Sequence, residues 1–117
     1  MNYRVLDQNS QDQVTSLFAS VFSSSEGEKE GELIGNLASG LSSNIDNEEI
    51  ICIGAYENES LIGSIFFTRL RFDGPNRIYM LAPVAVSTKH QGKGIGQALI
   101  NFGLNELKIR SVDVAIT

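Results

Sequence analysis

The chain has 117 residues, 42% of them hydrophobic, which is typical of one globular domain with its own core. A net charge of −5 at pH 7 argues against general nucleic-acid binding, and the apolar runs are too short to span a bilayer. The N-terminus lacks a basic segment followed by an apolar stretch, so no secretory signal is visible. The single cysteine, Cys52, excludes an internal disulfide. These features predict a cytoplasmic protein.

The N-terminal part of the sequence predicts a strand followed by a helix. The strand covers residues 2–7, and the spacing Ser10-x-x-Gln13 is a capping-box signature that begins the helix. Apolar side chains then recur at helical spacing, which predicts one face that packs on the core. The residues on this face are Val14, Leu17, Phe18, Val21 and Phe22. Residues 23–27 are predicted to break the helix.

Residues 28–41 predict a second helix with a weaker pattern. Its inward residues are expected to be Leu33, Ile34, Leu37 and Leu41. Because three glycines lower its helix propensity, we expect a mobile or irregular segment. These glycines are Gly31, Gly35 and Gly40.

Three antiparallel strands follow a polar linker at residues 42–49. They are predicted over residues 50–56, 61–72 and 77–86, and turn sequences at 57–60 and 73–76 join them as hairpins. A helix over 94–109 and a last strand over 112–116 complete the order. Pro83 lies within the third of these strands, where proline removes a ladder hydrogen bond, so it predicts a bulge or an edge strand.

The segment between the third of these strands and the last helix is rich in glycine. It reads Gln91-Gly92-Lys93-Gly94-Ile95-Gly96. Glycines let backbone N–H groups approach a ligand, and a helix N-terminus carries partial positive charge, so the segment predicts an anion site that suits a diphosphate. A P-loop is excluded because Gly94, rather than Ser or Thr, follows Lys93. A dinucleotide-binding loop is excluded because its third glycine would fall at Gln97 or Leu99.

The stretch from Leu81 to Ile100, in which Gln91-x-x-Gly94-x-Gly96 follows a strand and precedes a helix, resembles the coenzyme A loop of the GCN5-related N-acetyltransferases. The resemblance is close over residues 78–117 and rests on the order of elements over residues 1–77. It implies one α/β domain over residues 1–117 with a mostly antiparallel mixed sheet flanked by helices. The acceptor-side helices would lie at about residues 9–41 and the acetyl-CoA-binding core at about 78–117. The implied function is transfer of an acetyl group from acetyl-CoA to a primary amine of a small molecule or protein.

The resemblance also implies which residues bind acetyl-CoA. The backbone of residues 84–86 would pair with the pantetheine arm, in a wedge opened by a bulge at Pro83, and the Val84 N–H would donate to the thioester carbonyl. Backbone N–H groups from Gly92 to Gln97 would hold the pyrophosphate, with local positive charge from Lys89, His90 and Lys93. The implied binding residues are Val84, Ala85, Val86, Gln91, Gly92, Lys93, Gly94, Ile95, Gly96 and Gln97.

The sequence leaves the general base open, because residues 79–86 contain no acid. An acidic group near the start of the second helix could provide the base or attract a cationic amine, although a solvated helix face is the favoured interpretation. This group is Glu26, Glu28, Glu30 and Glu32. Cys52 is interpreted as a core thiol and His90 as a surface loop residue, and a chain with one of each predicts no metal site.

The usual fold of the family continues after the last predicted strand with a helix and two strands, and that part commonly supplies a tyrosine as general acid. The tyrosines here, Tyr3, Tyr56 and Tyr79, all precede the glycine-rich segment. We therefore expect a C-terminally truncated version of the fold, whose open apolar edge favours a homodimer. The alternative function is a catalytically impaired CoA-binding or self-associating module, and a remnant without a ligand is a third interpretation.

Overall fold

The computed structural model describes residues 1–70, 78–110 and 114–116 and contains a five-stranded sheet. Its strands are β1 (Asn2–Val5), β2 (Ile50–Glu57), β3 (Ser60–Leu70), β4 (Ile78–Val86) and β5 (Val114–Ile116). They lie side by side in chain order; β1 to β4 are antiparallel, and β5 is parallel to β4. The predicted turn at 73–76 lies outside the described residues, as do residues 71–72, 77 and 112–113 of the predicted strands.

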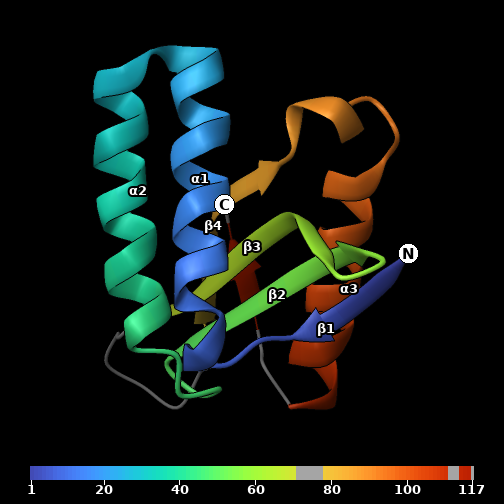
Figure 1. Cartoon of the computed structure of the whole chain (residues 1–117). Helices are drawn as coiled ribbons and strands as arrows, with labels where there is room; N and C mark the ends of the chain where they lie inside the picture. The colour runs from blue at the N-terminus through green and yellow to red at the C-terminus, as the bar shows by residue number, and fades with distance from the viewer. Residues whose placement is uncertain (71–77, 111–113, 117) are drawn as a thin grey trace.

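Helices cover both faces of this sheet (Figure 1). They are α1 (Gln11–Glu26), α2 (Glu28–Ser43) and α3 (Ile95–Ile109), with short 3₁₀ turns η1 (Gln8–Ser10) and η2 (Thr88–His90). Because side chains alternate along a strand, the core divides into two clusters. Phe66 packs with Phe18 on the α1–α2 side, whereas its neighbour Phe67 packs with Leu99 on the α3 side. The predicted mostly antiparallel mixed sheet flanked by helices is confirmed.

The second helix differs from the prediction in its regularity and in part of its inward face. Residues 28–43 form an unbroken α-helix, so the expected irregular segment is wrong. Ile34 and Leu41 pack against the core as predicted, whereas Leu33 and Leu37, also predicted to point inward, are 54% and 47% exposed. The buried positions instead carry small residues, which let α2 lie close against α1. They are Gly31, Gly35, Ala38 and Ser42.

The glycines of α2 therefore serve packing. A Cβ placed on Gly31 would lie 2.8 Å from the Ala19 carbonyl oxygen, and one on Gly35 would lie 3.0 Å from the Ala19 Cβ. A Cβ on Gly40 would meet nothing within 4 Å. Two of the three glycines thus permit a close helix–helix approach that the hydrophobic pattern alone did not indicate.

The beginning and end of α1 also differ from the prediction. Ser10 precedes the first helical residue, but in the described part of the chain its side chain makes no capping hydrogen bond, so the predicted capping box is wrong. The Gln13 side chain accepts a hydrogen bond from the Tyr56 hydroxyl instead. The helix also runs through the predicted break to Glu26, and only Gly27, with φ of 99°, separates it from α2. Within the described residues, no helix is long and apolar enough to cross a membrane.

Strand β4 contains the bulge that Pro83 predicts. Between the pairs Ile65–Val84 and Phe67–Leu81, β4 advances by three residues while β3 advances by two. Ala82 and Pro83 therefore lie opposite a single residue of β3. Proline favours such a bulge because it has no N–H to donate to the strand ladder. On the other side of β4, β5 pairs only with Ile78–Met80.

Candidate active site

The glycine-rich segment joins β4 to the N-terminus of α3. Gly92 and Gly94 have φ angles of 80° and 79°, the left-handed region that glycine adopts readily. Gly94 is the N-cap of α3 and has no side chain to cap the first turn. Within the described residues, none of the backbone N–H groups from Gly92 to Gln97 donates to another residue. Such a run of unpaired N–H groups at a helix N-terminus is a typical anion-binding arrangement.

The upper half of β4 presents a second set of unpaired backbone groups. The Ser87 N–H donates to the Ile62 carbonyl at 2.7 Å, so Ser87 and Ala85 direct their peptide groups toward β3. By the same alternation, Val84 and Val86 direct their peptide N–H and C=O groups away from β3. They face the edge of β4 along which β5 pairs with Ile78–Met80. Within the described residues no strand lies beside Val84 on that side, so its N–H is open to an extended ligand.

The Gln91 side chain lies at the corner between these two sets of groups. Its Nε2 donates to the Val86 carbonyl at 3.0 Å. This bond fixes the start of the glycine-rich segment against the end of β4. Gln91 was predicted as a binding residue; the structure gives its side chain this contact within the protein.

The positive charge beside the loop comes mainly from exposed lysines. Lys89 and Lys93 are exposed, whereas the His90 side chain is largely buried. The His90 Nε2 lies 3.4 Å from the Glu57 Oε1 at the end of β2. Its Nδ1 is buried and has no hydrogen-bond partner among the described residues. His90 therefore links the loop to the β2–β3 turn, and the prediction of a surface loop residue is only partly right.

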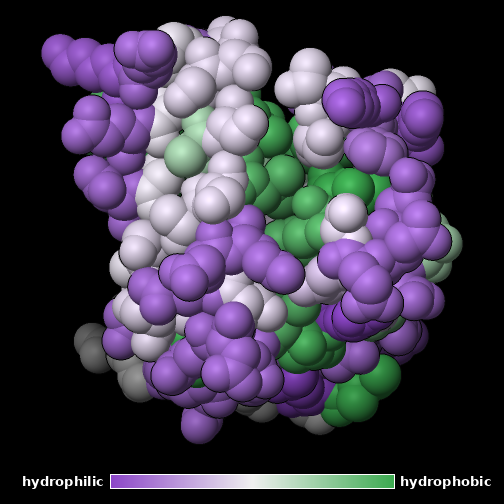
Figure 2. Space-filling view, viewed as in Figure 1, coloured by the Kyte–Doolittle hydropathy of each residue, from purple (hydrophilic) through white to green (hydrophobic). Residues whose placement is uncertain are grey.

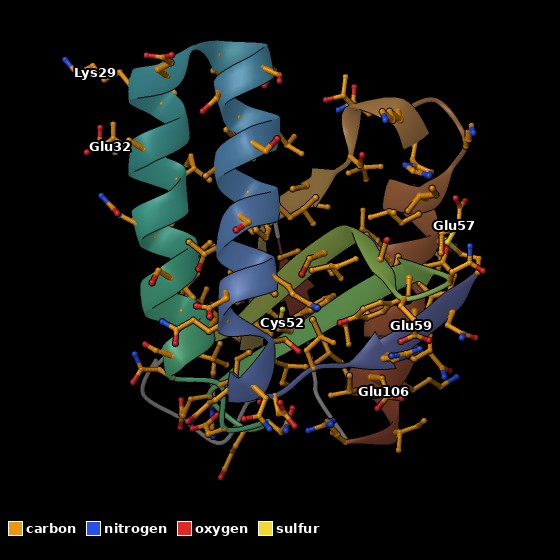
Figure 3. All side chains as sticks on the ribbon, in the orientation of Figure 1. Lys29, Glu32, Cys52, Glu57, Glu59 and Glu106 are labelled. Carbon is orange, nitrogen blue, oxygen red and sulfur yellow. The ribbon has the colours of Figure 1, made fainter. Side chains whose placement is uncertain are left out.

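The four acids predicted as a possible base lie at the end of α1 and in the first two turns of α2. All four predicted acids, Glu26, Glu28, Glu30 and Glu32, are exposed, and Glu32 points outward from α2 (Figure 3). Glu57 and Glu59 lie at the β2–β3 turn instead, on the same side of the molecule as the glycine-rich loop (Figure 3). The sequence Glu57-Asn58-Glu59-Ser60 indicated only a turn, and no pattern in it pointed to a site.

The tyrosines have structural roles in the described residues. The Tyr79 hydroxyl donates to the Glu48 carbonyl, and Tyr79 is fully buried. Tyr56 donates to Gln13, and the Tyr3 ring stacks on Phe102. These contacts engage all three tyrosines within the protein.

Cys52 is a core thiol on the α1 face of β2. It is fully buried, and its Sγ lies 3.2 Å from the Ser64 Oγ. Burial raises the pKa of the thiol to about 12, against a smaller lowering by the Ser64 hydrogen bond. This environment disfavours the reactive thiolate.

We expect Cys52 in the folded protein to resist a thiol reagent at pH 8 and to react with one equivalent after denaturation. Because an unfolded cysteine has a pKa of about 8.5, the unfolded state releases its proton first as the pH rises. Stability is therefore expected to fall between about pH 9 and pH 12, as a urea titration at each pH would measure. Rapid labelling of the native protein would contradict the assignment.

The sequence model of the Acetyltransferase (GNAT) family matches residues 12–115. The chain belongs to the acetyltransferase (GNAT) family. Its matched region contains the bulged β4, the glycine-rich loop and α3. A relative of this GNAT chain is YjhQ of Escherichia coli K12, described as an uncharacterized N-acetyltransferase, which is 37% identical over 60 residues. That match covers 49% of this chain, and the chain spans about a third (33%) of the relative's length.

Solved structures share the fold of this GNAT chain. A possible acetyltransferase from Clostridium difficile 630 has a TM-score of 0.77 at 15% identity, covering 98% of this chain and 76% of that one. A GNAT acetyltransferase from Brucella melitensis in complex with acetyl-CoA has a TM-score of 0.75 at 24% identity, covering 98% and 73%. A GCN5-related N-acetyltransferase from Ralstonia eutropha JMP134 has a TM-score of 0.77 at 16% identity, covering 99% and 82%.

Proposed function

We propose that this chain binds acetyl-CoA and transfers its acetyl group to a primary amine of a small molecule or protein. The observation that carries the proposal is the run of unpaired N–H groups from Gly92 to Gln97, which continues from the open edge of β4 at Val84. One set suits a pyrophosphate, and the other suits an extended amide-bearing arm. The solved Brucella GNAT structure in complex with acetyl-CoA supports this choice of ligand.

The proposed binding residues follow the path of such a ligand. The backbone of Val84, Ala85 and Val86 lies along the pantetheine arm, and Gly92 to Gln97 surround the pyrophosphate. Lys93 is exposed beside the loop and adds positive charge. Gln91 acts through its bond to the Val86 carbonyl, by fixing the corner between arm and pyrophosphate.

In the proposed reaction, the nitrogen of a neutral amine attacks the thioester carbonyl carbon. Negative charge develops on the carbonyl oxygen, and the Val84 N–H stabilises it by donating a hydrogen bond. The new C–N bond becomes the amide bond of the product, and the C–S bond breaks. CoA leaves as a thiolate that takes up a proton. The amine loses its own proton to a base.

We expect free CoA thiol to appear when acetyl-CoA and a primary amine are supplied together. A colorimetric thiol assay across a panel of amines measures this, and acetyl-CoA without an amine is the control. Calorimetric binding of acetyl-CoA with no thiol release for any amine would favour the alternative, a CoA-binding or self-associating module. Absence of acetyl-CoA binding would overturn both.

The homodimer stays a proposal. It is supported by β5, which within the described residues is an outer strand of the sheet. Unpaired strand edges favour pairing with a second copy. The cytoplasmic location, and the absence of nucleic-acid and membrane partners, likewise stay predictions from composition.

A further inference from the structure

A cleft of about 430 Å³ lies between α1 and the β2–β3 turn, apart from the glycine-rich loop. Figure 2 shows the surface hollowed beside α1, with hydrophobic residues at the bottom of the hollow. The volume suits a small molecule rather than a protein segment. The residues that line the cleft are Gln13, Ser16, Leu17, Ser20, Glu59, Ser60 and Leu61.

The bottom of the cleft is formed by residues that pack on the α1 side of the sheet. Leu17 and Leu61 are half-buried and pack against the same core cluster as Ala85. Ala85 is the neighbour of Val84 on β4 and pairs with Ser64 of β3. The cleft and the Ala85 side chain therefore lie on the same face of the sheet, the face covered by α1.

One polar side chain of the cleft is held in a fixed orientation. The Tyr56 hydroxyl donates to the Gln13 Oε1 at 3.2 Å, which leaves the Gln13 Nε2 as the free donor. Tyr56 is itself buried, and the Arg4 guanidinium lies 4.3 Å from the centre of its ring. Gln13 therefore offers N–H donors at a set position, as a hydroxyl-binding site requires.

The other polar groups of the cleft are free to bind. Within the described residues, no hydrogen bond engages the side chains of Ser16, Ser20 or Ser60, and no ion pair engages the Glu59 carboxylate. Among the described residues that line the cleft, Glu59 is the only charged one. Three hydroxyls, one amide and one unpaired carboxylate match a cation that carries hydroxyl groups.

We propose that this cleft binds a small hydroxyl-bearing primary amine, with the Glu59 carboxylate as the counter-ion of its ammonium group. Leu17 and Leu61 contact its carbon skeleton, and Gln13 donates to one of its hydroxyls. The identity of this amine as the acetyl acceptor rests on the proposed function; its binding in the cleft does not.

Glucosamine and glucose are a matched pair of probes for this site, because they share a ring and hydroxyls and only glucosamine carries an ammonium group. In amide NMR titrations of the full chain, glucosamine is expected to shift the signals of Ser16, Ser20 and Ser60 with saturation, and glucose is expected to shift them much less. Equal responses to both sugars, or no saturable shift with glucosamine, would overturn the proposal.

The charge of Glu59 is tested by Glu59→Gln, with Glu32→Gln as the matched control. Both variants remove one exposed carboxylate, but Glu32 points outward from α2 (Figure 3). We expect Glu59→Gln to weaken glucosamine binding about three- to tenfold, since the ion pair is solvent-exposed, and Glu32→Gln to leave it unchanged. An equal effect of both variants, or none from Glu59→Gln, would contradict the assignment.

Acetyl-CoA calorimetry on the same samples separates the two proposals. Glu59→Gln is expected to leave acetyl-CoA affinity unchanged. Acetyl-CoA binding without glucosamine binding would remove the cleft proposal alone. Glucosamine binding without acetyl-CoA binding would remove the proposed function and leave the cleft as an amine site.

Discussion

Replacing Gly94 by aspartate is expected to lower acetyl-CoA affinity more than a hundredfold. Gly94 has φ of 79°, and a Cβ added there would meet nothing within 4 Å, so the side chain has space. A carboxylate beside a pyrophosphate faces like charges at close range, and two unit charges about 4 Å apart repel by about 4 kcal/mol at an effective dielectric constant of 20. A hundredfold loss corresponds to about 2.7 kcal/mol. Isothermal calorimetry measures it.

Asparagine at the same position is the matched control. Both Asn and Asp tolerate the left-handed backbone better than other residues with a side chain, and they have nearly the same size. Gly94→Asn is therefore expected to lose much less affinity than Gly94→Asp. If the two variants bind acetyl-CoA equally, a negative charge at the N-terminus of α3 does not affect acetyl-CoA affinity, and the proposed pyrophosphate site is wrong. A denaturation curve for each variant shows that it is folded.

Replacing Gly31 by alanine is expected to destabilise the fold by about 1–2 kcal/mol. The new Cβ would lie 2.8 Å from the Ala19 carbonyl oxygen and 2.8 Å from the Ser23 Cβ, so α1 and α2 must separate. Overpacking of this kind typically costs about 1–3 kcal/mol, and the gain in helix propensity offsets up to about 1 kcal/mol of it. The shift in the urea midpoint at unchanged slope measures the result.

Gly40→Ala in the same helix is expected to act in the opposite direction. Its Cβ would meet nothing within 4 Å, so the substitution gains helix propensity of up to about 1 kcal/mol without a clash. Both variants replace glycine by alanine, but only the one at Gly31 places the new Cβ against α1. A stabilising Gly31→Ala would mean that the close approach of α1 and α2 is wrong.

The strands and α3 could be predicted because their signals are local. Apolar runs bounded by turn residues predicted both ends of β2 and the start of β3 to within one residue. Pro83 predicted the bulge because a missing N–H has the same consequence in any sheet. The helix predicted over 94–109 is observed as α3 over Ile95–Ile109.

The face of α2 and the residues of the cleft could not be predicted in the same way. Hydrophobic periodicity predicts that leucines point inward, and it therefore placed Leu33 and Leu37 on the inward face. The distance between α1 and α2 is instead set by small side chains at the buried positions of α2. Glu59 lines the cleft together with the α1 residue Ser16, which lies 43 positions earlier in the sequence. Only the fold brings them together, because no local pattern links a turn to a helix so distant in sequence.

The agreement between chain order and strand order constrains how the sheet can be built. Each strand pairs with the next strand along the sequence, so no segment must thread between two others that are already joined. The β2–β3 pair closes the shortest loop and has the smallest entropy cost, which favours it as an early folding unit. The parallel strand β5 must wait for α3 as its crossover. A polypeptide that stops before β5 would still retain every pairing among the other four strands.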